Sequence, residues 1–199
     1  LCVFIIGFLI VFGARLFLSV IQSQQDGALT ILGPAIEVVL KLSLVLMPIL
    51  FIRFVHREPL GSFGISWGET PFRHLLIGAS TAVLWLILDF LALVFVFGSG
   101  VVTFGWRSDM VWSVWLFNFV YLLTLNSLGE EIESRGYLQT VFSRAIGMRR
   151  GIMISAVLFG ASHIPINIYI YRSSLMTTLY HVAGAAIFGV VAGYLFVIT

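Results

Sequence analysis

The chain of 199 residues is too apolar for a water-soluble protein. Hydrophobic residues make up 60% of it and charged residues 10%, whereas a soluble domain carries roughly a quarter charged residues. The net charge of +2 gives no basis for nucleic-acid binding, and the single cysteine excludes an internal disulfide. With a mean hydropathy of +1.08, residues 1–199 are expected to form a single transmembrane domain whose main partner is the lipid bilayer.

Apolar segments long enough to cross a bilayer recur along the chain. A membrane-spanning helix needs about 20 mostly apolar residues, which predicts an all-α, polytopic transmembrane helix bundle. Six windows meet this requirement: Leu1–Ile21, Thr30–Val55, His74–Phe97, Met110–Leu128, Ile152–Tyr171 and Leu175–Ile198. Since the chain opens and stops within apolar runs, we expect it to be part of a longer protein with further spans.

Arginines mark alternate connections between these windows. Six lie in or beside the second and fourth connections, namely Arg53, Arg57, Arg73, Arg144, Arg149 and Arg150, whereas the other connections hold only Arg107 and Arg172. An excess of basic residues marks the cytoplasmic side, so the second and fourth connections are predicted to be cytoplasmic. This multi-pass protein belongs in the cell membrane of a bacterium or archaeon, or in the endoplasmic reticulum of a eukaryote.

Ionisable residues inside the predicted spans are costly and therefore mark candidate functional positions. Glu37 and Lys41 are four residues apart, which favours a mutually neutralising pair. Arg15 either extends to the interface or pairs with Asp89, and these two alternatives stay open. No catalytic role is assigned to these four residues.

An acidic group follows the fourth window, in the sequence Gly129-Glu-Glu-Ile-Glu-Ser-Arg135. Glu131 and Arg135 share a helical face, so Arg135 is predicted to hold Glu131 ionised. Glu130 points about 100° away and is predicted to be a free carboxylate. One held and one free carboxylate suit acid–base chemistry. A charged helix end among lipid headgroups explains the spacing equally well.

A histidine in the fifth window favours the catalytic interpretation. A lone histidine in an apolar helix is more often a hydrogen-bonded core residue, but His163 lies sixteen residues after Gly147, and Glu131 lies sixteen before it. In an antiparallel hairpin that turns near Gly147, both reach a similar depth. Asn167 follows His163 by four residues and is predicted to share its face, if Pro165 leaves the turn intact.

The last window is punctuated by glycines. Gly189-x-x-x-Gly193 permits close approach between helices, and we interpret it as packing. His181, near the start of this window, fits an interfacial histidine at least as well as a member of the site.

Two short motifs resemble those of the CAAX protease and bacteriocin-processing (CPBP) family of intramembrane proteases. Glu130-Glu131-x-x-x-Arg135 matches the first motif and is followed by the usual Gly-Tyr-Leu, and Phe159-x-x-x-His163 matches the second. The resemblance covers about Leu128–Thr199, within a predicted catalytic core of about 110–199. The family's third motif, a histidine followed four residues later by asparagine, comes after the glycine-rich helix. It is expected beyond Thr199, and the alternative is a protein that lacks this motif and is inactive.

The resemblance implies an intramembrane endopeptidase that works in the cytoplasmic half of the bilayer. Glu130 is assigned as the general base that activates water, with Glu131 tied to Arg135, although the reverse assignment stays open. His163 would stabilise the oxyanion or position the water, supported by Arg135, Phe159 and Asn167. If a metal such as Zn²⁺ is bound, Glu130, Glu131 and His163 are its expected ligands. The cofactor is left open because the sequence has no His-Glu-x-x-His helix.

Substrates implied by the resemblance are prenylated CAAX-type C-termini, peptides or membrane proteins, and the sequence does not choose among them. Two other classes of function compete with the protease. A non-catalytic immunity or regulatory protein could retain the fold, and a transporter or proton relay could use the same intramembrane residues. The transporter is disfavoured because the chain shows no internal repeat.

Overall fold

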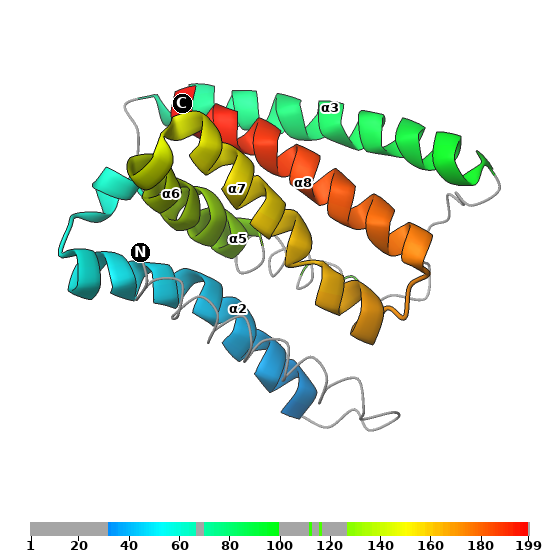
Figure 1. Ribbon diagram of the computed structural model, residues 1–199, viewed down its shortest axis with the longest axis horizontal. Coiled ribbons are helices and arrows are strands. Elements are labelled where there is room, and N and C mark those ends of the chain that lie inside the picture. Colours follow the sequence, from blue (N-terminus) through cyan, green and yellow to red (C-terminus); the bar gives the residue numbers. More distant parts are fainter. Residues whose placement is uncertain (1–31, 67–69, 100–111, 113–115, 117–126, 199) are drawn as a thin grey trace.

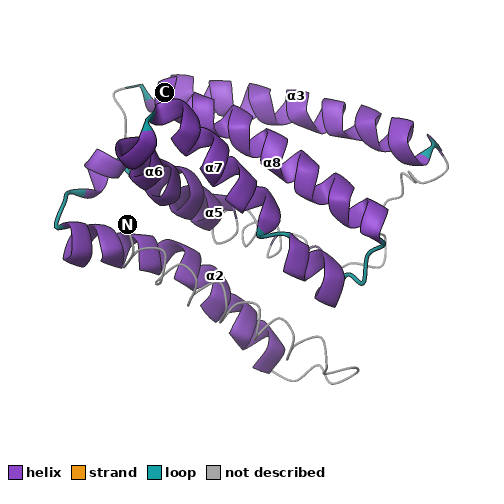
Figure 2. Cartoon of the chain, in the orientation of Figure 1, coloured by secondary structure: helices purple, strands orange, loops and turns teal. Residues whose placement is uncertain are grey.

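The computed structural model describes residues 32–66, 70–99, 112, 116 and 127–198, except for the side chains of residues 32–38, 40 and 170. Every regular element in this part of the chain is a helix (Figure 2). The main helices are α2 (Leu32–Leu50), α3 (Pro71–Phe97), α5 (Gly129–Glu131), α6 (Thr140–Ile146), α7 (Met148–Ala161) and α8 (Leu175–Ile198). The predicted helical bundle is therefore confirmed.

Three of the elements between these helices are π-helical and extend their neighbours. The first, η1 (Phe51–His56), continues α2, and the second, η5 (Ile132–Gln139), joins α5 to α6 in one uninterrupted rod. The third, η6 (Ile166–Ile170), follows α7 after a short turn, and a 3-10 helix, η2 (Leu60–Phe63), follows η1. Isolated π-turns often occur at functional sites, and η5 and η6 carry the predicted site residues Arg135 and Asn167.

The helices lie side by side in the order α3, α8, α7, the rod formed by α5, η5 and α6, and finally α2 (Figure 1). Helix α7 packs against both α8 and the rod, so it occupies the middle of the described bundle. This places the residues of α7 between two layers of helix. Both motifs of the sequence lie at these central contacts.

Three described helices are long and apolar enough to cross a membrane: Pro71–Phe97, Met148–Tyr169 and Leu175–Ile198. They correspond to the third, fifth and sixth predicted spans. The second predicted span coincides with the continuous helix formed by α2 and η1, whereas the windows 1–21 and 110–128 lie outside the described residues, apart from isolated positions. No described residue of α3 is buried, and Phe95 is 91% exposed. Together with the three helices of spanning length, this exposed apolar surface fits an integral membrane protein.

Glycines allow α7 to approach its neighbours closely. A Cβ atom on Gly189 would lie 3.0 Å from the Cα atom of Ala156, and one on Gly193 would lie 2.9 Å from Cγ2 of Ile152. The predicted packing role of Gly189 and Gly193 is confirmed.

The second and fourth connections meet at one end of the bundle. Arg144 donates hydrogen bonds of 3.0 and 2.9 Å to the two carboxylate oxygens of Glu58, and another of 2.8 Å to the carbonyl of Ser62. Its guanidinium also lies 4.5 Å from the centroid of the Phe63 ring, which is fully buried. Two connections that were predicted to share the cytoplasmic side are thus joined directly.

This junction is expected to weaken in acid. The hydrogen bond from Ser62, together with the contact from Arg144, holds the pKa of the Glu58 carboxyl below its ordinary value. A lowered pKa in the folded state means that the junction stabilises the fold above the ordinary glutamate pKa of about 4.3, and that this stabilisation is lost as the pH falls through the lowered value. The melting temperature of Glu58→Gln in detergent should therefore be below that of the wild type at pH 7, and the gap should narrow as the pH falls below the ordinary glutamate pKa. A gap that is constant over this range would contradict the role of Glu58.

Candidate active site

A tight helical hairpin aligns the two motifs. The rod ends at Gly147, whose φ of 91° suits glycine, and α7 begins at the next residue. Near the turn the two helices touch, because a Cβ atom on Gly151 would lie only 2.6 Å from the Cα atom of Ser143. Since Ser143 and Gly151 are equally far from Gly147, the hairpin keeps a symmetrical register, which places Arg135 opposite Phe159.

Arg135 is the centre of the first motif. Its side chain is buried, with an exposed fraction of 2%, and Nη1 lies 3.3 Å from Oε1 of Glu131. This is the predicted pair. The guanidinium carbon also lies 4.3 Å from the centroid of Phe159 and 5.8 Å from that of Phe188. Arg135 therefore links the first motif to the phenylalanine of the second motif.

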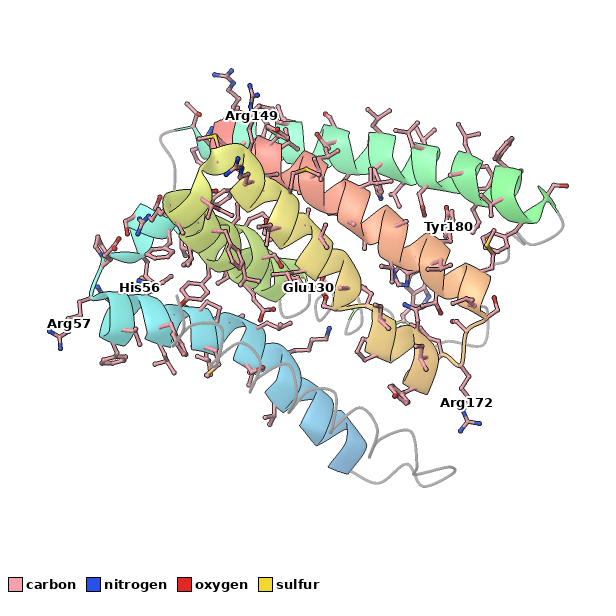
Figure 3. All side chains as sticks on the ribbon, viewed as in Figure 1. His56, Arg57, Glu130, Arg149, Arg172 and Tyr180 are labelled. Carbon is pink, nitrogen blue, oxygen red and sulfur yellow. The ribbon has the colours of Figure 1, made fainter. Side chains whose placement is uncertain are left out.

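Glu130 differs from the prediction. It is not a free carboxylate, because Nζ of Lys41 lies 3.6 Å from its Oε1. Lys41 comes from α2, the helix that packs against α5 and η5, and Figure 3 shows Glu130 on the side of the rod that faces α2. The predicted pairing of Lys41 with Glu37 is not tested, since the side chain of Glu37 lies outside the described residues.

The second motif leads into a group of three polar residues. The ring of His163 lies 5.0 Å from that of Phe159 and 5.0 Å from that of His181, measured between centroids. Nδ1 of His163 donates a hydrogen bond of 2.8 Å to the carbonyl of Phe159. Asn167, which is 2% exposed, donates to the carbonyl of His163 and lies 2.9 Å from Nδ1 of His181. This buried amide thus ties η6 to α8.

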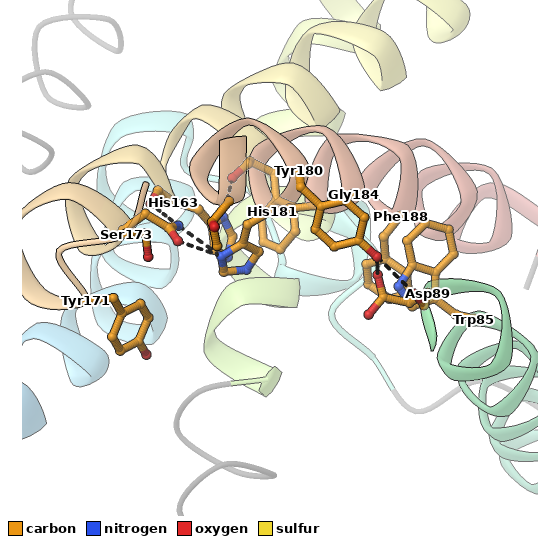
Figure 4. Close-up of a pocket in the computed structure, with 13 residues that line it drawn as sticks. Trp85, Asp89, His163, Tyr171, Ser173, Tyr180, His181, Gly184 and Phe188 are labelled. Carbon is orange, nitrogen blue, oxygen red and sulfur yellow. Dashed lines mark hydrogen bonds between the residues drawn. The ribbon is translucent and has the colours of Figure 1, made fainter. Parts of the chain in front are cut away.

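These three residues line a cavity of about 510 Å³ between α3, α7 and α8 (Figure 4). The opposite wall carries Asp89, whose Oδ1 and backbone carbonyl each accept a hydrogen bond of 2.9 Å from the hydroxyl of Tyr180. The alternative pairing of Asp89 with Arg15 lies outside the described residues. Trp85 and Phe188 add aromatic surface to the cavity, and their rings lie 5.3 Å apart. The cavity therefore combines an apolar body with a few polar groups, as ligand sites usually do.

Residues 110–199 match a family model described as type II CAAX prenyl endopeptidase, Rce1-like. This segment belongs to the Rce1-like family. The match includes both motifs and the cavity residues of α7 and α8, so this segment is similar to a family of proteases. No curated protein and no solved structure shows a significant match to the chain.

Not all of the predicted site residues of this Rce1-like segment come together. His163, Asn167 and Phe159 line the cavity, and Arg135 lies against the Phe159 ring beside it. Neither glutamate is among the described residues that line the cavity, because Glu130 contacts Lys41 and Glu131 contacts Arg135.

The expected metal ligands do not form a metal site in this arrangement. Glu130, Glu131 and His163 belong to separate contacts, and the described part of the chain contains no cluster of three or more histidine, cysteine, aspartate or glutamate residues that could hold a metal ion.

His181 lines the cavity, although the sequence alone fits an interfacial histidine at this position at least as well. The chain turns at Arg172, which has a φ of 48°, and His163 lies nine residues before this turn and His181 nine after it. The equal counts that suggested a shared depth for Glu131 and His163 would have paired the two histidines as well. Asp89 stands out in the sequence as a carboxylate inside a predicted span, but no sequence signal connects it to Tyr180, 91 positions away.

Proposed function

We propose that this chain is an intramembrane endopeptidase that hydrolyses a peptide bond with a water activated by glutamate. The observation that carries the proposal is the chain of contacts from Glu131 through Arg135 and Phe159 to His163, which joins both family motifs across the hairpin. Buried charges are retained inside membrane helices mainly for function. The match to a protease family supplies the type of reaction.

Glu130 is the proposed general base. Glu131 is held by a buried guanidinium, whereas the partner of Glu130 is a lysine on another helix at the longer distance of 3.6 Å. The longer ion pair leaves the Glu130 carboxylate freer to turn toward a water molecule. Glu130 takes a proton from water as the water oxygen bonds to the carbonyl carbon. When the C–N bond breaks, Glu130 returns that proton to the leaving nitrogen, so that a carboxyl group and an amine are formed.

His163 stabilises the substrate carbonyl or positions the water in this scheme. Because the glutamates lie outside the cavity wall and His163 lies on it, we put the scissile bond at the end of the cavity next to Phe159. The substrate is a peptide or membrane protein of the CAAX type, with a prenylated C-terminus as one class. The aromatic surface formed by Trp85 and Phe188 suits an apolar group on such a substrate.

The test is cleavage of a library of prenylated and unprenylated peptides by the purified chain in liposomes, at the cytoplasmic pH. We expect Glu130→Gln, Glu131→Gln and His163→Ala each to lower kcat by about 10²- to 10⁴-fold, the usual value of acid–base assistance. Glu133→Gln is the matched control on the same rod and should keep its activity. A chelator should leave the rate unchanged, given the separated donor set.

Different outcomes distinguish the parts of the proposal. A larger loss in Glu131→Gln than in Glu130→Gln would reverse the roles of the two glutamates. Cleavage that persists in all three variants would remove these residues from the site. A wild-type chain that cleaves no peptide of the library would favour a non-catalytic immunity or regulatory protein.

A further inference from the structure

We infer that His181 is a catalytic residue of this chain, because its imidazole presents a hydrogen-bond donor to the cavity beside the acceptor presented by His163. The inference rests on the proposed peptidase function and assigns a role to a residue outside both family motifs. Three observations carry it: the contact between the two rings, the hydrogen bond that fixes each Nδ1 atom, and the position of both rings on the cavity wall.

The protonation of His163 follows from its partner. A carbonyl oxygen only accepts hydrogen bonds, so the contact between Nδ1 and the carbonyl of Phe159 requires the proton on Nδ1. In the neutral ring Nε2 then holds a lone pair. Since Nδ1 is turned back toward α7, Nε2 is on the opposite edge of a ring that lines the cavity. His163 thus offers the cavity an acceptor.

In His181 the proton is on the other ring nitrogen, Nε2. The amide nitrogen of Asn167 is anchored by its hydrogen bond of 2.8 Å to the carbonyl of His163. That nitrogen lies 2.9 Å from Nδ1 of His181, and the amide oxygen lies farther away, at 3.2 Å. The nitrogen is therefore the donor and Nδ1 the acceptor, which leaves the proton of the neutral ring on Nε2. His181 thus offers the cavity a donor.

A donor and an acceptor on adjacent rings suit the hydrolysis of an amide. Nε2–H of His181 donates to the carbonyl oxygen of the substrate, and this hydrogen bond strengthens as the oxygen gains negative charge in the tetrahedral intermediate. Nε2 of His163 accepts a hydrogen bond from the attacking water and orients it. Neither histidine gains or loses a proton overall, so the glutamate keeps its role as base.

Asn167 is a positioning residue in this arrangement. It is buried and bonds to both partners, so it fixes the protonated nitrogen of His181 as well as the distance between η6 and α8. A side chain that merely filled space would not need an amide at this point.

The role of His181 is tested by substitutions whose side-chain amide replaces either Nε2 or Nδ1 of the imidazole. The amide of glutamine reaches about as far as Nε2 of histidine, whereas the amide of asparagine reaches about as far as Nδ1. We expect His181→Ala and His181→Asn to lower kcat by about 10²- to 10³-fold, the loss found for one oxyanion donor, with little change in KM. His181→Gln should retain most of the activity. His74→Ala, which changes a partly exposed histidine at the start of α3, is the matched control.

A purely structural role for His181 predicts the opposite order. Asparagine could still accept from Asn167 and would be tolerated, whereas glutamine would not. The inference is overturned if His181→Asn is more active than His181→Gln, or if His181→Ala cleaves like the wild type. With either outcome, the proposed peptidase function is still tested independently, by the effects of Glu130→Gln and His163→Ala on cleavage.

The protonated nitrogens can also be measured without any activity. In protein labelled with ¹⁵N-histidine, the nitrogen chemical shifts at neutral pH should show a proton on Nδ1 of His163 and on Nε2 of His181. A proton on Nδ1 of His181 would overturn the inference even if the chain cleaves peptides. If the shifts agree but the wild type cleaves nothing, the catalytic role falls together with the proposed function.

Discussion

Replacing Arg135 with leucine is expected to destabilise the folded chain by about 3 kcal/mol and to abolish cleavage. The change removes the partner of Glu131 and the cation that stacks on Phe159. Breaking a buried ion pair from one side costs about 3–5 kcal/mol. The side chain of Glu131 is 45% exposed, so water compensates for part of the lost ion pair. The loss of the cation–π contact adds about 1 kcal/mol, and the sum stays at the lower end of that range.

Arg135→Lys tests whether the positive charge alone is sufficient, or whether the planar guanidinium is also needed. Lysine keeps a positive charge near Glu131, but it lacks the planar guanidinium that lies over Phe159, so we expect an intermediate melting temperature and a strongly reduced kcat. The measurements are thermal unfolding in detergent and peptide cleavage. Arg149→Leu, on an exposed residue at the start of α7, is the matched control (Figure 3). Arg135→Leu protein that melts like Arg149→Leu would contradict a structural role for the ion pair.

The part of the site that was predictable is the part fixed by local spacing. Glu131 and Arg135 are four residues apart on one helix, so their contact follows from helical geometry alone. The hairpin register follows from counting, because Gly147 is the only break between two apolar helices and equal distances from it give equal depth. Arg135 and Phe159 lie at the same count, and the structure places them in contact.

Contacts between distant helices were not predictable. Spacing suggests a local pair of Lys41 with Glu37, which the described residues do not test, and nothing in the sequence points to the contact of Lys41 with Glu130 on another helix. Which way a residue faces around its helix depends on how the helices pack, and neither spacing nor hydropathy gives that angle. The same reason explains why counting suggested a shared depth for Glu131 and His163 but could not show that the glutamates stay outside the cavity wall.

The extent of the bundle was predicted more fully than its contacts. Length and hydropathy alone identify helices that must cross a bilayer, and three of the six predicted spans appear as such helices among the described residues. His181 shows the limit of assigning roles by type. A histidine near the end of a span is usually interfacial. Counting from the turn at Arg172 gives His181 the depth of His163, but only the structure shows that the two rings and Asn167 are in contact.

Gly160→Ala is expected to separate α7 from α8 and to remove activity without touching a site residue. A Cβ atom on Gly160 would lie 2.6 Å from the carbonyl oxygen of Val182 and 2.8 Å from Cβ of Ala186. Neither atom can rotate away, since one belongs to the backbone and the other is the first side-chain carbon. Forcing an extra methyl group into packed helices typically costs 1–3 kcal/mol, and we expect about 2 kcal/mol here.

The loss of activity follows from the position of Gly160 at the contact between α7 and α8. It lies one turn before His163, and Val182 comes directly after His181, so helices forced apart at this point also move the two imidazoles apart. Gly78→Ala on α3 is the matched control, because its Cβ atom would meet nothing within 4 Å, and alanine should stabilise that helix by about 0.5–1 kcal/mol. Melting temperature and cleavage should both fall in Gly160→Ala and recover in part when Ala186→Gly removes one of the two clashes. If Gly160→Ala melts like Gly78→Ala, the close approach of α7 and α8 does not hold the two histidines together.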